Sequence, residues 1–346
     1  MKIALITDTH FGIRGDNRNV LQHQIDFFNN NFFPTIDGMG IDTIVHLGDL
    51  VDRRKYINFE TLRTMREEVL EKFKRYNTHI ICGNHDVYYK HSNRVNALVE
   101  LVGHENCSIY MDATTIELGG KPFLMLPWIN EENQEKSLLE VKQTQAKIIF
   151  GHLELAGFEM YRGTICAHGM DRKIFTKFDR VLTGHFHERS KQQNVYYLGA
   201  PYQMTWGDFP SKRGFHIFDT ETNAAEFIEN KESLFRMIVY DDSVEQTSIG
   251  DTNLKDCYVK VLVQKKENPY QFDTFITQIE EQSPNDVRII EQFEYDEDAP
   301  VLETEDTPTV INRTIDSMQL SVNKDKLKAR MQQVYNLALT TERETE

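Results

Sequence analysis

The sequence predicts a layered α/β sandwich followed by a smaller α+β unit. Three observations indicate this: short apolar, β-branched runs recur along the first half of the chain, a stretch with helical periodicity lies between two of them, and the pattern changes near Leu234. Continuous apolar runs of this length are typical of strands buried on both faces. The expected buried strands are Lys2 to Asp8, Thr43 to Asp49, His79 to His85, Lys147 to His152 and Arg180 to His185.

An amphipathic helix is expected between the second and third runs. From Phe59 to Tyr76, apolar residues recur at helical spacing among charged neighbours, which indicates a helix that packs on the sheet. Shorter, turn-linked runs predict antiparallel or edge strands, so the sandwich is expected to end near residue 220. These runs are Ala113 to Leu118, Lys121 to Trp128, Val195 to Pro201 and Gly214 to Thr220.

Beyond Leu234 the elements are fewer. Strand-like Tyr258 to Val263, helix-like Pro269 to Glu281 and strand-like Val287 to Gln292 predict a small α+β unit. An acidic stretch follows, and two further helices are expected at its end, Val310 to Met318 and Lys324 to Leu339. The apolar stripe of the last helix suits either a core of its own or docking onto another chain, and both interpretations stay open.

Bulk properties restrict the function classes. A net charge of −15 argues against a broad basic surface that would hold duplex nucleic acid by phosphate neutralisation alone. Much of this charge is concentrated in an acidic segment between residues 286 and 306, so the net value misrepresents the first half of the chain. The four cysteines form no CxxC pair, Asp8 interrupts the first apolar run, and no run approaches the roughly 20 apolar residues of a membrane span. We therefore expect a reducing, cytosolic setting.

Carboxylate, imidazole and amide side chains stand at the ends of the predicted buried strands. Carboxyl ends of strands in an open α/β sheet line one crevice, so these groups are expected to converge. Oxygen and imidazole donors without thiolate favour Mn²⁺, Fe²⁺ or Zn²⁺. Each motif alone is common by chance, but the ordered set predicts a metal centre. The motifs are Asp8-Thr9-His10, Gly48-Asp49-Leu50-Val51-Asp52, Gly83-Asn84-His85-Asp86, Gly151-His152 and Gly184-His185-Phe186-His187.

In these motifs and their order the chain resembles the calcineurin-like metallophosphoesterases, and within them the SbcD-type nucleases. Among those it is most similar to the nuclease subunits of tailed-phage recombination endonucleases. The resemblance implies a β-sandwich flanked by helices, with a small α+β cap domain and a C-terminal helical tail. It implies a nuclease domain at 1–225, a DNA-binding cap at 226–298, and an acidic linker with helices at 299–346 that bind an ATPase partner.

The resemblance also implies a pair of divalent metal ions, with Mn²⁺ expected. Transferred position by position, one ion would be bound by Asp8, His10, Asp49 and His187. The second would be bound by Asp49, Asn84, His152 and His185, with Asp49 bridging. Two such ions lower the pKa of a bound water and stabilise both the attacking and the leaving oxygen at phosphorus.

Three further residues are expected to serve catalysis. His85 matches the family's histidine that binds no metal, which implies that it stabilises the transition state and protonates the leaving 3′ oxygen. Asp86 is expected to orient His85. Asp52 stands where cellular members commonly carry a histidine; orientation of His85 or of another ligand is one interpretation, and a helix N-cap or loop carboxylate is the other.

Basic residues flank the predicted crevice. Arg53, Arg54, Lys90 and Arg94 are candidate contacts to a DNA backbone, although each taken singly also suits a solvated helix face. The resemblance further implies pairing of two copies through a helix at Phe59 to Tyr76 and a helix at Asn93 to Val102, whose apolar positions could equally face only the sheet.

As a whole, the resemblance implies a metal-dependent DNA nuclease, acting as an exonuclease on duplex ends and an endonuclease on single strands. It implies work with an SMC-like ATPase in DNA recombination, repair and replication, in the cytoplasm, or in the host cytoplasm if a phage encodes the chain. The alternative is a stand-alone metallophosphatase or cyclic-nucleotide phosphodiesterase with the same metal core. A degenerate scaffold without activity is disfavoured, because every expected ligand position is filled.

Overall fold

The computed structural model describes residues 1–102, 106–161, 163–244, 249, 252–291, 315, 324, 326–328 and 330–331. The chain divides into two compact units, Met1–Glu291 and Gln292–Glu346. In the second unit the described residues are helical. The acidic linker and most of the two C-terminal helices expected there lie outside the described residues.

The first unit contains a six-stranded sheet with the strand order β16-β15-β1-β2-β3-β6. Its strands are β1 (Lys2–Ile6), β2 (Thr43–His46), β3 (Asn77–Ile81), β6 (Cys107–Tyr110), β15 (Arg213–Asp219) and β16 (Ala224–Asn230). Strands β1, β2, β3 and β6 are parallel, whereas β15 runs antiparallel to β1. The carboxyl ends of β1, β2 and β3 therefore lie at one edge of this sheet.

A second six-stranded sheet has the order β13-β14-β12-β9-β8-β7. Its strands are β7 (Thr114–Leu118), β8 (Lys121–Leu126), β9 (Ile148–His152), β12 (Arg180–Gly184), β13 (Ser190–Gln192) and β14 (Val195–Tyr197). Strands β8, β9, β12 and β14 are parallel, so the ends of β9 and β12 also lie at one edge. The five buried strands expected from the apolar runs are all present, and the α/β sandwich is confirmed.

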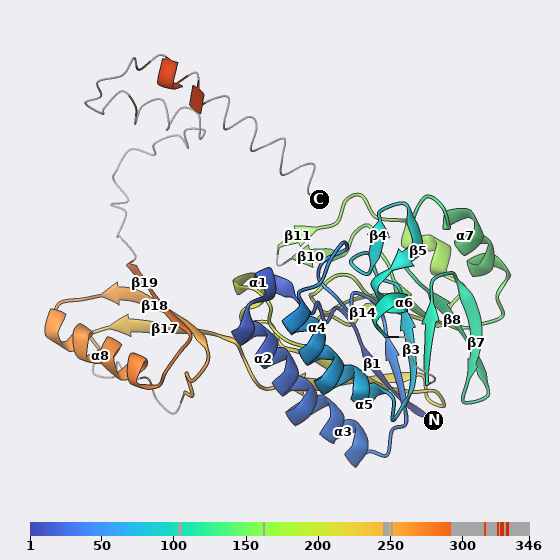
Figure 1. Cartoon of the computed structure of the whole chain (residues 1–346), viewed down its shortest axis with the longest axis horizontal. Coiled ribbons are helices and arrows are strands. Elements are labelled where there is room, and N and C mark those ends of the chain that lie inside the picture. Colours follow the sequence, from blue (N-terminus) through green and yellow to red (C-terminus); the bar gives the residue numbers. More distant parts are fainter. Residues whose placement is uncertain are drawn as a thin grey trace. The chain divides into compact units, whose positions relative to one another are not determined.

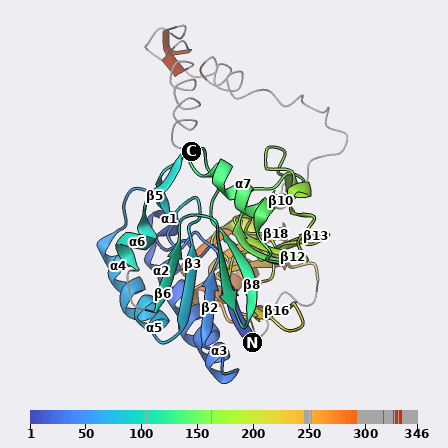
Figure 2. The ribbon, with the colours of Figure 1, turned by 90° about the vertical axis from the view of Figure 1, so that its right-hand side faces the viewer.

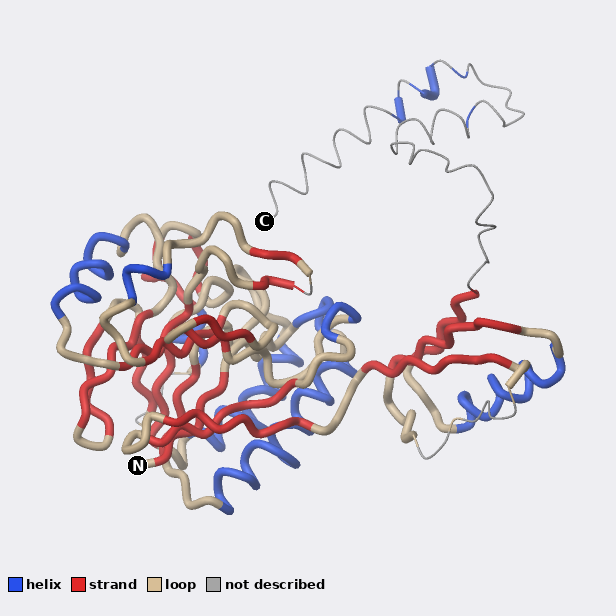
Figure 3. Tube along the Cα trace, turned by 180° about the vertical axis from the view of Figure 1, so that it is seen from behind, coloured by secondary structure: helices blue, strands red, loops and turns tan. Residues whose placement is uncertain are grey.

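Three apolar clusters define the layers of the sandwich. One joins β1, β2 and β3 to the helices on the outer face of the first sheet, through residues such as Ile44, Phe28 and Phe73 (Figure 1). A second lies between the sheets, where Leu5 and Val45 pack with Phe150 and other residues of the second sheet. The third joins β9 and β12 to α7 (Gln134–Gln143) (Figure 2). The strands thus lie between outer helices (Figure 3).

The remaining helical elements are short or joined end to end. The helix expected at Phe59 to Tyr76 is confirmed as α4 (Phe59–Met65), η2 (Arg66–Leu70) and α5 (Glu71–Phe73), which follow one another directly. Further helical elements are α1 (Ile13–Asp16), α2 (Arg18–Asp26), η1 (Phe27–Phe32), α3 (Phe33–Gly38), η3 (Arg172–Phe175) and η4 (Trp206–Asp208). None of the described helices is long and apolar enough to cross a membrane.

The helix expected from Asn93 to Val102 is wrong in its first half. Ser92–Asn96 forms β5, which pairs with β4 (Val87–Tyr89), and only Ala97–Leu101 is helical, as α6. The physical reason is local: the Asn96 side chain accepts a hydrogen bond from the Val99 amide at 2.9 Å, so it caps the helix start. A second short hairpin pairs β10 (Glu159–Tyr161) with β11 (Thr164–Ile165).

A separate three-stranded parallel sheet follows, in the order β17-β18-β19. It consists of β17 (Phe235–Asp241), β18 (Tyr258–Lys265) and β19 (Asp286–Glu291), with α8 (Pro269–Glu281) between the last two strands. Phe272, Phe275 and Ile279 of α8 pack in one cluster with the strands, so the expected small α+β unit is present. The boundary that we expect after residue 225 falls inside β16, which pairs with β15 as far as Asn230.

Candidate metal centre

Loops at the carboxyl ends of five parallel strands carry the predicted ligands. Four of these ligand-bearing segments are loops that follow β1, β2, β3 and β12. The fifth ligand position, His152, is the last residue of β9 itself. The side chains of Asp8, His10, Asp49 and His152 are all buried. Asp8, His10, Asp49 and His185 have positive φ angles of 52°, 45°, 57° and 91°. Residues other than glycine rarely adopt this conformation, which costs about 1–3 kcal/mol each and is typical of functional sites.

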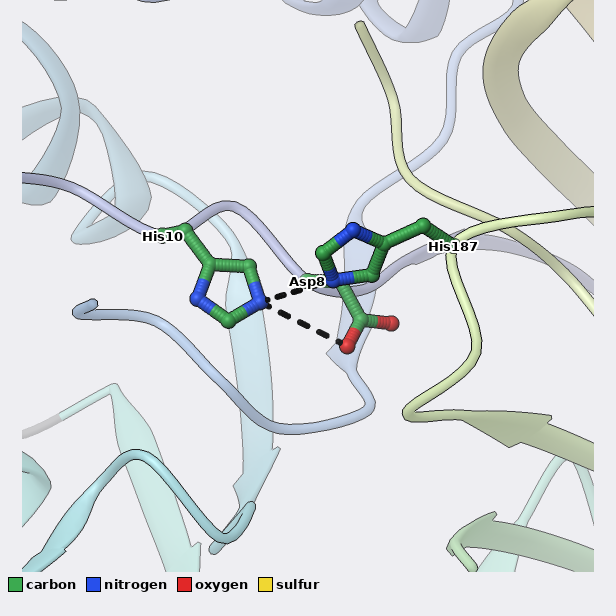
Figure 4. A group of neighbouring side chains, drawn as sticks. All are labelled: Asp8, His10 and His187. Atoms are coloured by element: carbon green, nitrogen blue, oxygen red, sulfur yellow. Dashed lines mark hydrogen bonds and ion pairs between the residues drawn. The ribbon is translucent and has the colours of Figure 1, made fainter. Parts of the chain in front are cut away.

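The first group of ligand atoms comes from Asp8, His10 and His187 and lies within 4.8 Å. The Nε2 atom of His10 is 3.1 Å from Nε2 of His187 and 3.9 Å from Oδ1 of Asp8 (Figure 4). Burial by itself lowers the pKa of His10, but the carboxylates of Asp52, Asp49 and Asp8 outweigh it and raise this pKa to about 9. The group therefore attracts a positive charge.

The second group comes from Asp49, His152 and His185, whose ligand atoms also lie within 4.8 Å of one another. The amide oxygen of Asn84 belongs to the same place, because it is 3.0 Å from His152 Nε2 and 2.8 Å from His185 Nδ1. Burial opposes protonation of His152, yet Asp49 and Asp8 raise its pKa to about 9. A carboxylate oxygen, an amide oxygen and two imidazole nitrogens converge here.

Asp49 connects the two groups. Its Oδ2 atom is 3.7 Å from His10 Nε2 and 3.3 Å from His152 Nε2, so one oxygen faces both. Its other oxygen accepts a hydrogen bond from the His85 amide at 2.8 Å. Burial alone raises the pKa of Asp49, but the charges of His152, His85 and His10 outweigh it and lower this pKa. The carboxylate is therefore held ionised between two sets of donors.

Acceptors on the far side of three histidines fix their tautomers. His152 Nδ1 lies 2.7 Å from the carbonyl oxygen of Leu47, which can only accept, so this nitrogen carries the proton. In the same way His10 Nδ1 faces the Asp52 carboxylate at 3.5 Å, and His185 Nε2 faces Glu154 at 3.5 Å. In each ring the opposite nitrogen is then the one that would offer a lone pair to a bound metal ion.

Asp52 serves two neighbours at once. Its carboxylate faces His10, and its backbone carbonyl accepts a hydrogen bond from His85 Nδ1. His10, Asp52 and His85 also form a third set of possible ligand atoms within 4.8 Å. His85 Nδ1 donates to the Asp52 carbonyl, whereas His10 Nδ1 faces the Asp52 carboxylate at ion-pair distance and has no hydrogen-bond partner among the described residues. We therefore interpret this set as a polar network that orients the two rings. The interpretation of Asp52 as an orienting residue is favoured over that of a helix cap.

Asp86 does not orient the His85 ring, contrary to the expectation from sequence. Its buried carboxylate accepts hydrogen bonds from the backbone amides of Gly83, Asp49 and Leu50 at 2.8–2.9 Å, and from Val51 at 3.3 Å. Three of these amides belong to the loop after β2 and one to the loop after β3. Asp86 therefore ties the loop after β2 to the loop after β3, and it positions Asp49 rather than His85.

Glycine is required where these loops touch. A Cβ atom at Gly83 would collide with the carboxylate and the amide nitrogen of Asp49. A Cβ atom at Gly184 would collide with the hydroxyl of Thr7, next to Asp8. The absence of a side chain thus permits the close approach of the two loops at both positions.

The four candidate DNA contacts differ in their availability. Arg53 bonds to the Gly12 carbonyl and to Asp16 and packs over the Tyr56 ring, and Arg94 pairs with Glu132. Lys90 is exposed. By contrast, Nη1 of Arg54 is buried without a hydrogen-bond partner in the described part of the chain. Burial lowers the pKa of Arg54, while Asp49 opposes this, so its guanidinium lies within electrostatic reach of the centre.

The donor set fits a pair of divalent cations. It combines carboxylate, amide and imidazole groups, it shares one carboxylate between two clusters, and the outer acceptors leave the inward nitrogens unprotonated once a metal ion replaces the proton. Cys82 and Cys166 are buried and belong to none of the three ligand sets found among the described residues. The ligand sets found in the described part of the chain therefore contain no thiolate donor.

Two neighbours of the centre were not expected from the sequence. Glu154 lies two residues after His152, the same spacing that separates Asp8 from His10, and this spacing could have marked it. Trp128 tilts against the ring of His185 with 5.1 Å between centroids. It lies just beyond the carboxyl end of β8, so strand ends carry an aromatic side chain as well as ligands.

Comparisons with known proteins identify the family of this chain. The family model for calcineurin-like phosphoesterases matches residues 1–189. Exonuclease subunit 1 of Enterobacteria phage T4 is 36% identical over 242 residues, which cover 69% of this chain and 71% of that protein. Putative phosphoesterase 078R of Invertebrate iridescent virus 3 is 25% identical over 216 residues, 60% of this chain and 59% of its own length.

Among solved structures, an archaeal phosphodiesterase covers 66% of this chain and 100% of its own, with 16% identity and a TM-score of 0.34. That score is too low to support an argument. The assignment rests instead on the family model, which spans more than half of the sequence, and on the viral exonuclease subunit. This chain belongs to the calcineurin-like phosphoesterase family, whose members hydrolyse phosphate esters.

Proposed function

We propose that this chain is a metal-dependent DNA nuclease and the nuclease subunit of an ATPase-nuclease complex. It would act as an exonuclease on duplex ends and as an endonuclease on single strands, in DNA recombination, repair and replication. The observation that carries the proposal is the 36% identity to a protein named exonuclease subunit 1, over 69% of this chain. At 242 residues this alignment is longer than the family match to residues 1–189, so the likeness extends beyond the common phosphoesterase core.

Two divalent metal ions would be held by the two ligand groups. Asp8, His10, Asp49 and His187 would hold one, and Asp49, Asn84, His152 and His185 the other. When bound, such ions lower the pKa of a water and stabilise negative charge on the attacking and leaving oxygens. We propose Mn²⁺ for both, because the family resemblance implies it and mixed carboxylate, amide and imidazole donors accept it as they accept Fe²⁺ and Zn²⁺.

His85 would supply the proton for the leaving oxygen. Its Nδ1 atom is held by the Asp52 carbonyl, and its ring packs edge-on against His10 with 4.7 Å between centroids. Burial lowers the pKa of His85, so without substrate the ring is neutral and Nε2 carries a lone pair. An arriving phosphodiester adds negative charge beside it, which favours uptake of a proton at Nε2. That proton is then available to the 3′ oxygen as its bond to phosphorus breaks.

Arg54 is the strongest of the proposed phosphate contacts. Its buried Nη1 atom has no partner among the described residues, whereas the cationic groups of Arg53 and Arg94 already face carboxylates. A guanidinium with an unsatisfied donor is well suited to a phosphate oxygen. Lys90 and Arg94 would contribute at the surface, where salt screens them.

The remaining parts of the proposal concern assembly. The small α+β unit would contact DNA, and the C-terminal helices beyond residue 299 would bind an SMC-like ATPase. Two copies would pair through the helix that begins at Phe59 and the segment around α6. The chain would work in the cytoplasm, or in that of the host cell if a phage encodes it.

Digestion assays test the proposal. Purified protein with Mn²⁺ is given end-labelled duplex DNA, single-stranded DNA, a phosphomonoester and a cyclic nucleotide. We expect cleavage of both DNAs and slow hydrolysis of the two small substrates. Efficient turnover of the phosphomonoester or the cyclic nucleotide, with intact DNA, would show instead a phosphatase or a cyclic-nucleotide phosphodiesterase.

A truncation tests the assembly. Removing residues from 307 onward should leave manganese-dependent hydrolysis of a small phosphodiester intact and abolish co-purification with the ATPase subunit. Retained co-purification would contradict the role that we give to the C-terminal helices.

A further inference from the structure

A cavity of about 250 Å³ begins at the second ligand group. His152 belongs both to that group and to the lining of the cavity. The lining continues over Trp128 and Ile129 and over the segment that includes Gly169 and Met170. A substrate held at the ligand groups therefore lies next to this cavity.

The backbone that carries the cavity lining is firmly held. The amide of Trp128 donates to the carbonyl of Cys82 at 2.8 Å, and its own carbonyl accepts from the side-chain amides of Asn93 and Asn133 at 2.9 Å. The second lining segment is tied to the strand end, because the Met170 amide donates to the Glu154 carbonyl at 2.9 Å. The cavity is therefore preformed.

The chemistry of the lining selects a flat, uncharged group. Trp128, Ile129 and Met170 offer aromatic, aliphatic and thioether surfaces, and Glu131 and Glu154 place two carboxylates at the cavity. Among the described lining residues there is no lysine or arginine. Carboxylates repel a phosphate, whereas an aromatic wall binds a planar ring by stacking and a carboxylate accepts from exocyclic N–H groups.

The charge and the volume of the cavity both suit a single uncharged ring system. Arg172 and Lys173 line a neighbouring cavity of about 480 Å³ instead. A volume near 250 Å³ is below the roughly 300–1,000 Å³ of drug-sized pockets, so it suits one ring system and not a base pair.

We propose that this cavity binds the unstacked base of one nucleotide next to the scissile phosphodiester. The inference rests on the proposed nuclease function and adds a substrate preference to it. A base can enter only after leaving its stack and its pairing partner, and this costs least at frayed ends, mismatches and single strands. The enzyme should therefore act on nucleotides that are already unpaired, and it should read the base as a planar surface.

Abasic substitution tests the proposal on the substrate side. Single-stranded oligonucleotides of one sequence carry a tetrahydrofuran abasic residue at successive positions around a mapped cleavage site, and each is cleaved with Mn²⁺. Loss of the base should slow cleavage roughly tenfold or more at one position next to the scissile bond, since base stacking on an aromatic side chain has about this effect. Equal rates at every position would overturn the proposal.

Variants of the cavity identify the residue responsible. In Trp128→Ala the ratio of normal to abasic cleavage should fall close to one, whereas Trp128→Phe should keep most of it. Met170→Trp fills the cavity without replacing a residue of the ligand groups, and it should likewise bring the ratio of the two cleavage rates close to one. Trp206→Phe is the matched control and should keep it, because Trp206 packs against Phe235 with 4.8 Å between centroids. An undiminished ratio in both Trp128→Ala and Met170→Trp would overturn the assignment.

Binding without turnover gives an independent measure. In EDTA, 2-aminopurine placed at the sensitive position should change its emission on binding to the wild type and much less on binding to Met170→Trp. Bis(4-nitrophenyl) phosphate, which has no base, separates the two hypotheses. If the wild type cleaves neither this ester nor DNA, the nuclease proposal fails; if it cleaves DNA with no abasic effect, only the base site fails.

Discussion

The two ligand groups share Asp49 but differ in charge and exposure. The first adds the carboxylate of Asp8 and has the carboxylate of Asp52 behind His10. The second adds the neutral amide of Asn84, and the carboxylate behind its His185 is that of Glu154, which is 38% exposed. The side chain of His10 is 2% exposed and that of His185 is 17% exposed.

This difference assigns separate tasks to the two halves of the centre. A buried group with more carboxylates should bind a divalent cation more tightly, because its attraction is less screened. The less charged group adjoins the cavity lined by Trp128, so we expect substrate to enter on that side. We therefore expect stepwise metal binding, with the first group filled before the second.

The largest expected effect comes from Asp49→Asn. Because one carboxylate oxygen of Asp49 faces both groups, the substitution should weaken metal binding at both of them. The difference in affinity between the two groups should then disappear. We expect metal content to fall from two ions to fewer than one per chain, and DNA cleavage to fall about 1,000-fold or more. Mass spectrometry of bound metal and digestion of labelled DNA measure this. The exposed Asp179→Asn variant is the matched control, and two retained ions in Asp49→Asn would contradict the bridging role.

Metal binding should release protons and depend strongly on pH. Without metal, carboxylates raise the pKa values of His10 and His152 to about 9, so both rings are protonated at pH 7 and a metal ion must displace these protons. Affinity should therefore rise with pH, by about 10-fold per unit for each proton released, and become level above about pH 9. Calorimetry in buffers of different ionisation enthalpy counts the protons; none released at pH 7 would contradict the shift.

The same shifts predict how the metal-free fold responds to pH. A histidine whose pKa is raised on folding stabilises the native state fully below its unfolded value of about 6.5, and the contribution is lost as pH rises through the folded value near 9. In EDTA the melting temperature should thus decrease between about pH 6.5 and 9. Loaded protein should lack this decrease, since the metal ions replace the protons.

Asp52→Asn should weaken the first group only. The substitution keeps the backbone carbonyl that holds His85, and it removes the charge that faces His10 Nδ1. Carboxylates behind metal-binding histidines typically contribute about 10- to 100-fold in metal affinity. Titration with Mn²⁺ should show the tighter step weakened by this factor and the weaker step unchanged. A change in the weaker step alone would reverse the assignment of the two groups.

Glu154→Gln should give the smallest effect, in the second group. The carboxylate is partly exposed, so water screens its attraction to the Nε2 proton of His185. We expect a loss of only a few-fold in the weaker Mn²⁺ step, with the tighter step unchanged. Glu140→Gln on α7 is a matched surface control. A loss as large as that of Asp52→Asn would show that exposure does not separate the two groups.

The sequence predicted the parts of the centre that depend on strand order. Asp8, Asp49, His152 and His187 could be placed because buried apolar runs mark parallel strands, and parallel strands end at one edge. It did not predict what Asp86 does, because a carboxylate that accepts four backbone amides has no spacing signature. The assignment of Asn93 to a helix failed because the apolar spacing does not show where the Asn96 cap places the helix start.

Side chains that approach the centre from the side were also beyond prediction. Trp128 contacts His185 only because two strands from separate parts of the chain lie two positions apart in one sheet, with β9 between them. The partner of Arg53 is Asp16, which lies in a short helix with an irregular backbone. Such contacts follow from tertiary packing, and no local pattern records them.

The chain contains two tryptophans, one beside the second ligand group and one beside the small α+β unit. Trp128 lies next to a ligand histidine, so a paramagnetic ion at the second group should quench its fluorescence. Trp206 packs against Phe235 at the start of the small α+β unit. Two variants with a single tryptophan each would therefore carry built-in optical reporters, one for the filling of the centre and one for displacement of that unit.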